Sequence, residues 1–208
     1  MIKINKGTEP AEWTAKKLTS GFNKYEPIAE LRVSLLQEQG QICAYCMRRI
    51  PVKDRNESET SKIEHIKSRD SYHHLQLKYD NMVICCPGNI NGEYHCDKSK
   101  GNLAITFSPF DISTQRSVSY GTKDGTIKSN LSNINDDINS ILSLNNRMLK
   151  ANRLKELQGI VSVLDKKKWK KSQLEIKLQE WSKLSNKGTL KPYCGIVIWF
   201  LEKKLKNI

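Results

Sequence analysis

Apolar residues recur at helical spacing near the start of the chain. Ile28, Leu31, Leu35 and Leu36 follow a proline, and most of them fall three or four positions apart. Residues at that spacing share one face of a helix, so the pattern predicts a helix from Ile28 to Gln39. The predicted helix leads directly into the first pair of cysteines.

The middle of the chain predicts two short strands followed by a short helix. The strands are expected at Lys62 to Ile66 and at residues 80–84, where the second run stops at a Cys-Cys-Pro-Gly sequence. Proline and glycine end regular elements, so residues 89–94 are expected to form a loop, and His95 to Asn102 a short helix that Gly101 weakens. The polar stretch from Pro51 to Ser61 has no periodicity and predicts an exposed loop.

Alternating apolar and polar residues beyond residue 103 predict a β-hairpin. The alternation covers Ala104 to Phe107 and Ser117 to Tyr120, and it resumes at Thr126 to Lys128 after a Gly-Thr-Lys-Asp-Gly turn. Period-two alternation around a glycine-containing turn is typical of paired antiparallel strands.

From about residue 135 the pattern changes to helices. Asp136 or Asp137 is expected to cap the first helix, which ends near Leu144. Further helices are expected from Arg147 to Lys167, Ser172 to Leu184 and Tyr193 to Leu205, separated by glycine and proline. The predicted fold class is therefore α+β.

Positive charge is concentrated in these last helices. The 208-residue chain carries a formal net charge of +13, and from Arg147 to Ile208 there are 16 Lys and Arg residues against 5 Asp and Glu. This asymmetry predicts that the C-terminal region contacts a polyanion, while the middle region does something more specific. A solubilised helical face is the alternative interpretation.

Hydropathy indicates a protein without membrane segments. The longest apolar run, Cys194 to Leu201, is far shorter than the roughly 20 residues of a membrane span. The opening Met-Ile-Lys-Ile-Asn-Lys sequence lacks the apolar stretch of a signal peptide. We therefore expect a soluble, cytoplasmic protein with no membrane partner.

The cysteines predict a structural metal site. Cys43 and Cys46 have C-x-x-C spacing, and Cys86 and Cys96 form a second, split pair. Four thiolates close a tetrahedral zinc site with no open position, which is typical of structural zinc. Disulfides are the less favoured interpretation because nothing indicates a secreted framework. His95 is an alternative ligand, since imidazole binds zinc equally well.

The residues between the cysteine pairs suggest hydrolytic chemistry. Phosphodiester cleavage needs a base that activates water and a cation at the phosphate. His65 is the candidate base, Glu64 a hard oxygen ligand, and Asp97 a second oxygen ligand. Carboxylates suit Mg²⁺ or Mn²⁺, so this cation would be distinct from the zinc. Glu64 and His65 point to opposite faces of a regular strand, so they serve one site only at a strand end or a twist.

The order of these motifs resembles a known family. The segments Cys-Ala-Tyr-Cys, Ile-Glu-His-Ile, Tyr-Asp-Asn-Met-Val-Ile-Cys-Cys and His-Cys-Asp-Lys-Ser-Lys-Gly resemble those of HNH (ββα-metal) endonucleases. They are most similar to the PtuB-like branch, the HNH components of Septu and some retron antiphage defence systems. The likeness extends to the opening Met-Ile-Lys-Ile, the stretch from Ile134 to Arg153, and the closing Pro-Tyr-Cys-Gly-Ile-Val-Ile-Trp-Phe-Leu segment.

The resemblance implies a layout for the chain. A zinc-stabilised ββα-metal core is expected at residues 42–102, after an N-terminal helical segment at 1–41. A β-hairpin region at 103–133 and a basic helical region at 134–208 follow.

The resemblance also implies roles for individual residues. His65 matches the general base, and Glu64 the acidic metal ligand beside it. Asn81 matches the central asparagine that holds the loop between the strands. Asp97 stands where many HNH enzymes have His or Asn, and can coordinate the same cation. Lys100 matches the basic residue that ends the motif and contacts a phosphate.

The family pattern selects among the zinc ligands. Cys86 falls five residues after Asn81, where the third zinc cysteine is expected, and is therefore preferred to Cys85. The expected zinc set is Cys43, Cys46, Cys86 and Cys96. Cys85 and Cys194 are expected to be buried as small apolar residues.

The function implied is a metal-dependent endonuclease in antiphage defence. DNA is the expected substrate, and RNA, including transfer RNA, stays open because the site touches phosphate and reads no base. The family's nuclease works beside PtuA, an ABC/SMC-type ATPase, so such a partner is expected. The alternative is a zinc-stabilised nucleic-acid-binding or ATPase-adaptor module without catalysis.

Overall fold

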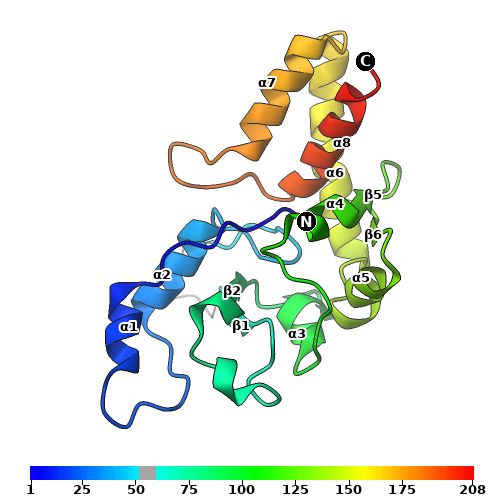
Figure 1. The fold of residues 1–208 in the computed structure, drawn as a ribbon. Helices are drawn as coiled ribbons and strands as arrows, with labels where there is room; N and C mark the ends of the chain where they lie inside the picture. The colour runs from blue at the N-terminus through cyan, green and yellow to red at the C-terminus, as the bar shows by residue number, and fades with distance from the viewer. Residues whose placement is uncertain (52–59) are drawn as a thin grey trace.

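Three small antiparallel sheets and a series of helices make up the described part of the fold. The computed structural model describes residues 1–51 and 60–208, so most of the predicted loop from Pro51 to Ser61 lies outside the described residues. Each sheet in the described part has two strands. The chain passes from two N-terminal helices through the small sheets to a helical C-terminal region (Figure 1). The mixture of helices and small antiparallel sheets confirms the predicted α+β class.

The N-terminal helices are α1 (Ala11–Lys17) and α2 (Ala29–Glu38). Helix α2 confirms the helix predicted from residue 28, and it buries Leu31 and Leu35 completely. Helix α1 was not predicted, because its one buried residue, Trp13, shows no periodicity.

Strands β1 (Lys62–His65) and β2 (Met82–Cys85) form the central antiparallel pair, in which Glu64 lies opposite Val83. Two short 3-10 turns, His73–Leu75 and Tyr79–Asn81, lie in the connection between them. Every residue of β2 is buried, which explains why it reads as a continuous apolar run.

A small hairpin replaces the loop expected at residues 89–94. Strands β3 (Asn89–Ile90) and β4 (Glu93–Tyr94) pair across Asn91 and Gly92, which both have positive φ angles, of 50° and 86°. An Asn-Gly pair is the preferred two-residue hairpin turn, so the sequence did carry this signal. Helix α3 (Cys96–Lys100) follows and confirms the predicted short helix.

The predicted hairpin beyond residue 103 is only half right. Strands β5 (Val118–Tyr120) and β6 (Ile127–Ser129) pair as expected, after helix α4 (Ile112–Ser117). The stretch 104–107 alternates in burial but is not a strand. The backbone N–H of Thr106 donates to the Asp137 carboxylate at 2.6 Å, so a side chain takes the place of a neighbouring strand.

The C-terminal region is helical, and its first boundary differs from the prediction. Helix α5 (Ser132–Asp136) continues into a π-helical turn, Asp137–Ile141. The prediction that Asp136 or Asp137 caps the helix is wrong, because both lie past its start. Asp137 is buried and instead accepts hydrogen bonds from the backbone and hydroxyl of Thr106.

The three remaining helices confirm the predicted set. They are α6 (Arg147–Lys166), α7 (Lys171–Ser182) and α8 (Cys194–Leu205). Helix α8 packs against α6 and α7 and is buried along most of its length. In the described part of the chain, none of the helices has the length and apolar character needed to cross a membrane.

Candidate metal centre and active site

Four cysteine thiols converge at the centre of the fold. The Sγ atoms of Cys43, Cys46, Cys86 and Cys96 all lie within 4.8 Å of one another, and all four residues are buried. The Cys43–Cys96 and Cys46–Cys86 sulfur pairs are 3.8 and 3.7 Å apart. Tetrahedral zinc with Zn–S bonds of about 2.3 Å requires S···S distances of about 3.8 Å. The donor set and its spacing therefore fit a four-coordinate metal ion.

Backbone contacts hold the first cysteine pair against β2. Cys43 donates its N–H to Arg48 O at 3.0 Å, and Ala44 donates to Ile84 O at 3.1 Å. The buried Gln39 amide also bonds Ile84, accepting from its N–H at 2.7 Å and donating to its carbonyl at 2.8 Å. This turn therefore sits on the strand that carries the chain to Cys86.

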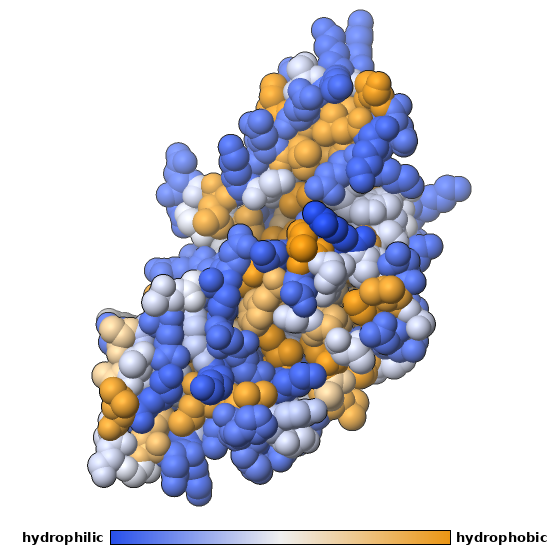
Figure 2. Space-filling model, viewed as in Figure 1, coloured by the Kyte–Doolittle hydropathy of each residue, from blue (hydrophilic) through white to orange (hydrophobic). Residues whose placement is uncertain are grey.

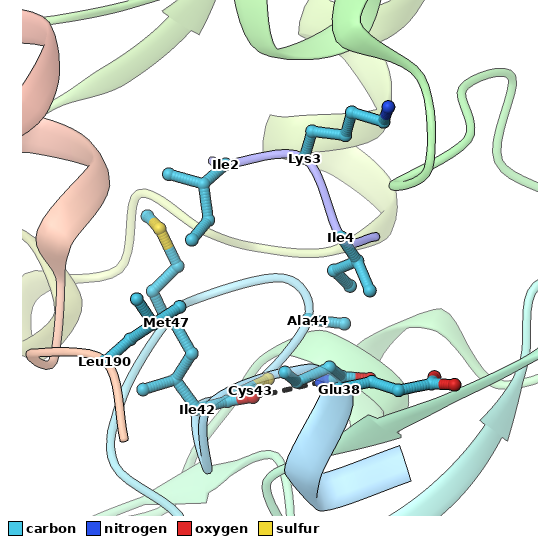
Figure 3. A pocket seen from close by; sticks show the side chains of 10 residues that line it. Ile2, Lys3, Ile4, Glu38, Ile42, Cys43, Ala44, Met47 and Leu190 are labelled. Carbon is cyan, nitrogen blue, oxygen red and sulfur yellow. Dashed lines mark hydrogen bonds between the residues drawn. The ribbon is translucent and has the colours of Figure 1, made fainter. Parts of the chain in front are cut away.

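The N-terminal segment covers the outer side of the same turn. Figure 3 shows Ile2 and Ile4 above the turn that carries Cys43 and Met47, with Leu190 at the side. The cavity between them has a volume of about 20 Å³, which is enough for about one water molecule. The covering segment thus shields the thiols and leaves no room there for a larger ligand.

Cys85 and His95 border the thiol cluster without joining it. Cys85 is buried in β2 beside the four ligands, and Cys194 is buried in α8. His95 is also buried, with Nδ1 3.1 Å from the Cys96 sulfur and 3.9 Å from the Cys86 sulfur. The alternative ligand His95 therefore lies beside four thiols that already complete a tetrahedral set.

The protonation of the thiols fits a site that takes up a cation. Burial raises the pKa of both Cys46 and Cys96 above the usual thiol range, whereas at Cys43 hydrogen bonds from the neighbouring thiols outweigh burial and lower the pKa. A bound metal ion offsets this cost by stabilising the thiolates, and protons are released as it binds.

A polar depression lies beside the thiol cluster. It has a volume of about 330 Å³, and its lining includes Glu64 and His65 from β1 and Asp97 and Lys100 from α3. His65 is the last residue of β1, and this end of the strand lets both neighbours reach one site. The structure therefore brings together four of the five residues that the family resemblance assigns to the catalytic site, all except Asn81.

Glu64 and Lys100 form a buried ion pair in this depression. Lys100 Nζ lies 2.7 Å from Glu64 Oε1 and donates to the His65 carbonyl at 3.2 Å. Burial, reinforced by the neighbouring Asp97 carboxyl, raises the pKa of Glu64 to about 8, and Lys100 opposes this rise. The Lys100 ammonium is thus directed at Glu64 and the backbone of His65, and its residue is only 1% exposed.

The His65 ring has a defined tautomer. Its Nε2 lies 2.9 Å from the Gln76 carbonyl oxygen, which can only accept a hydrogen bond, so Nε2 carries the proton. Nδ1 then holds the lone pair. Burial lowers the pKa of His65 to about 4, so the ring is neutral near pH 7. A neutral imidazole with a free lone pair can accept a proton from water.

Asn81 takes a different place from the other candidates. Its amide oxygen accepts from Lys67 N–H at 2.8 Å, and its amide nitrogen donates to the Lys67 and Leu75 carbonyls at 2.9 and 3.3 Å. Asn81 therefore ties the connection between β1 and β2 together from outside the depression.

Sequence reasoning missed several residues around His65. Gln76 acts through its backbone carbonyl, so its side-chain type gave no signal. Tyr25 presents its ring to His65 edge-on, with centroids 4.5 Å apart, from a segment far away in sequence. Arg69 and Lys98 line the depression but lie in polar stretches that read as ordinary surface.

Comparisons with known proteins give no assignment: no protein-family model matches the chain, and no curated protein matches it.

Proposed function

We propose that this protein is a metal-dependent endonuclease of the HNH (ββα-metal) type that hydrolyses phosphodiester bonds, most readily in DNA. One observation carries the proposal. Glu64 and His65 at the end of β1 share a polar depression with Asp97 of α3, beside a four-thiol metal centre. Strands β1 and β2 pair and, after the β3–β4 hairpin, helix α3 follows; this supports the proposal because the sequence motifs imply two antiparallel strands and a short helix.

Each residue of the depression has a role in this proposal. His65 Nδ1 accepts a proton from the attacking water, while the Gln76 carbonyl holds the ring in the required tautomer. Glu64 and Asp97 are hard oxygen donors in contact with each other, which fits Mg²⁺ or Mn²⁺. A cation held by these carboxylates would supply charge stabilisation at the phosphate. Zinc on the four cysteines would fix the position of α3 relative to β2.

Cleavage assays test the proposal. Purified protein is incubated with plasmid DNA and with total RNA, in Mg²⁺, Mn²⁺ or EDTA. Cation-dependent cutting of DNA is the expected result, and preferential cutting of RNA would change the substrate. No cutting of either in any condition would favour the alternative of a binding module.

We further propose, from the resemblance, that the nuclease acts in antiphage defence with a PtuA-like ATPase. A free nuclease would harm its host, so the isolated chain is expected to cut weakly and the complex strongly. The assay is therefore repeated with the ATPase present. Full activity of the isolated chain on plasmid would contradict this part of the proposal.

A non-catalytic nucleic-acid-binding module is the second candidate. The observation that favours it is the run of exposed lysines at the α6–α7 turn, which is sufficient for polyanion binding without any chemistry. The two candidates differ in their dependence on His65, because a binding module does not need this buried ring.

A further inference from the structure

Two cations at the rim of the depression have no part in the mechanism above. Arg69 and Lys98 both line the depression, and both side chains are exposed. The other two lining cations differ from them, because Lys100 pairs with Glu64 at 2.7 Å and Lys62 lies 4.0 Å from Asp97. Among the residues that the structure describes, neither Arg69 nor Lys98 has a carboxylate within ion-pair distance.

Each rim cation rests on a tyrosine ring. The Arg69 guanidinium lies 4.8 Å from the centre of the Tyr25 ring, and Lys98 Nζ lies 5.2 Å from the centre of the Tyr94 ring. A cation over an aromatic face is held in place but keeps its hydrogen-bond donors and its charge. Both cations are therefore oriented and still free to bind an anion.

The Tyr25 support is itself anchored to the active site. Tyr25 N–H donates to the Gln76 side chain at 3.3 Å, and the Gln76 amide donates to the Asn23 carbonyl at 3.1 Å. The same Gln76 holds His65 through its backbone carbonyl. The position of Arg69 is thereby linked to that of His65, the proposed base.

We propose that Arg69 and Lys98 form rim subsites that bind phosphates next to the one that is cleaved, and so make the site selective for a polynucleotide chain. This inference rests on the proposed function. Glu64 and His65 are buried in the depression and Asp97 beside them is half-buried, and the reacting phosphate must lie against these residues, whereas Arg69 and Lys98 are exposed. A polynucleotide carries further phosphates on both sides of the one that is cleaved, and exposed cations beside the site are the groups that such flanking phosphates would contact.

Two substrates of different length distinguish the contribution of the rim cations from that of the buried catalytic residues. Bis(p-nitrophenyl) phosphate has a single phosphodiester group, so it can use the catalytic residues but has no phosphate for the rim. A 20-base-pair DNA duplex can use both. Arg69→Ala and Lys98→Gln are expected to lower kcat/KM on the duplex by about tenfold to a hundredfold, because each removes a charge-assisted hydrogen bond to a phosphate. Both variants should hydrolyse the small ester at the wild-type rate.

The controls match each substitution elsewhere on the surface. Arg116→Ala and Lys123→Gln remove exposed cations that do not line the depression, and they should leave both substrates unchanged. An equal loss on both substrates for the rim variants, or no loss on either, would overturn the inference.

A binding measurement keeps the inference testable if the wild type proves inactive. Duplex affinity is measured by fluorescence anisotropy in EDTA, so that neither cleavage nor a catalytic cation is required. Arg69→Ala and Lys98→Gln should each weaken binding and lower the slope of log affinity against log salt by about one. Inactive wild type with this binding loss would defeat the proposed function alone, and unchanged binding would defeat the rim subsites.

Two substitutions of Tyr25 test whether its ring positions Arg69. Tyr25→Phe keeps the ring beneath Arg69 and should bind the duplex like the wild type. Tyr25→Leu removes the aromatic face and should reproduce part of the Arg69→Ala loss of affinity. Equal affinity for the Phe and Leu variants would show that the ring does not position Arg69.

Discussion

His65 and Glu64 are neighbours in the sequence, and burial makes both neutral near pH 7 in the metal-free chain. It lowers the pKa of His65 to about 4 and raises that of Glu64 to about 8. Neutral His65 is ready to act as a base, whereas protonated Glu64 must lose its proton before it can bind a cation. At acid pH, Glu64 rather than His65 should therefore limit the reaction.

This order of titration predicts a pH profile that depends on the cation. Protons and the cation compete for Glu64, so activity should rise as pH increases toward the Glu64 pKa of about 8. Raising the Mn²⁺ concentration should move this acid limb to lower pH. Cleavage rates between pH 5 and 9 at several Mn²⁺ concentrations provide the check. A limb that stays fixed would contradict Glu64 as the cation ligand.

Lys100 is predicted to stabilise the fold as well as the site. It is buried, and it bonds both the Glu64 carboxylate and the His65 carbonyl. Lys100→Ala should lower the free energy of unfolding by about 1 to 3 kcal/mol, because it leaves the buried Glu64 carboxyl and the His65 carbonyl without their hydrogen-bond donor. Lys98→Ala, on the exposed side of the same helix, should change it by less than about 0.5 kcal/mol. Urea unfolding with zinc present measures both, and equal effects would contradict the buried-pair account.

Among the elements, the sequence pattern correctly predicted those strands and helices whose positions depend mainly on the spacing of their own apolar residues. The strand of residues 62–65, the all-buried strand of 82–85 and the long C-terminal helices follow from apolar periodicity. The cysteine set followed from spacing and from the family pattern, and it converges in space.

The elements that were missed depend on tertiary contacts. Residues 104–107 alternate like a strand, but the carboxylate of Asp137 bonds the backbone of Thr106 in place of a neighbouring strand. The Asp137 side chain makes its hydrogen bonds to Thr106 and therefore does not cap a helix. Gln76 and Tyr25 reach His65 through a carbonyl and a ring edge, which no sequence motif records.

Two cysteines of the proposed metal site follow α2, one directly follows β2 and one begins α3, and adjacent cysteines provide a matched test of the site. Cys86→Ser should reduce the zinc content below one per chain and lower the melting temperature, because one ligand of the tetrahedral set is removed. Cys85→Ser should keep one zinc per chain, since Cys85 lies outside the set. Metal analysis by mass spectrometry together with thermal unfolding measures both. Zinc loss in Cys85→Ser alone would contradict the assigned ligands.

In the whole molecule, a lysine-rich group of helix ends lies apart from the candidate active site. The end of α6, the start of α7 and the end of α8 meet at one tip of the molecule, away from β1 and β2 (Figure 1). Hydrophilic side chains project from this tip (Figure 2). The exposed lysines there are Lys166, Lys167, Lys168, Lys170, Lys171, Lys203, Lys204 and Lys206.

This lysine tip is predicted to contribute to nucleic-acid affinity and not to chemistry. Replacing Lys167, Lys168, Lys170 and Lys171 with Gln should reduce the slope of log affinity against log salt, by about 0.9 for each phosphate that the variant no longer neutralises. Hydrolysis of bis(p-nitrophenyl) phosphate should be unchanged. Anisotropy between about 50 and 200 mM salt tests the slope. An unchanged slope would identify the tip as a solvated helical face.

The proposed nuclease activity depends on His65, and a paired substitution tests this dependence. Plasmid cleavage in Mn²⁺ is compared for the wild type, His65→Ala and His73→Ala, where His73 is an exposed histidine outside the depression. The proposed mechanism predicts that His65→Ala abolishes cleavage while keeping its zinc, and that His73→Ala cuts like the wild type. Undiminished cleavage by zinc-loaded His65→Ala would contradict it.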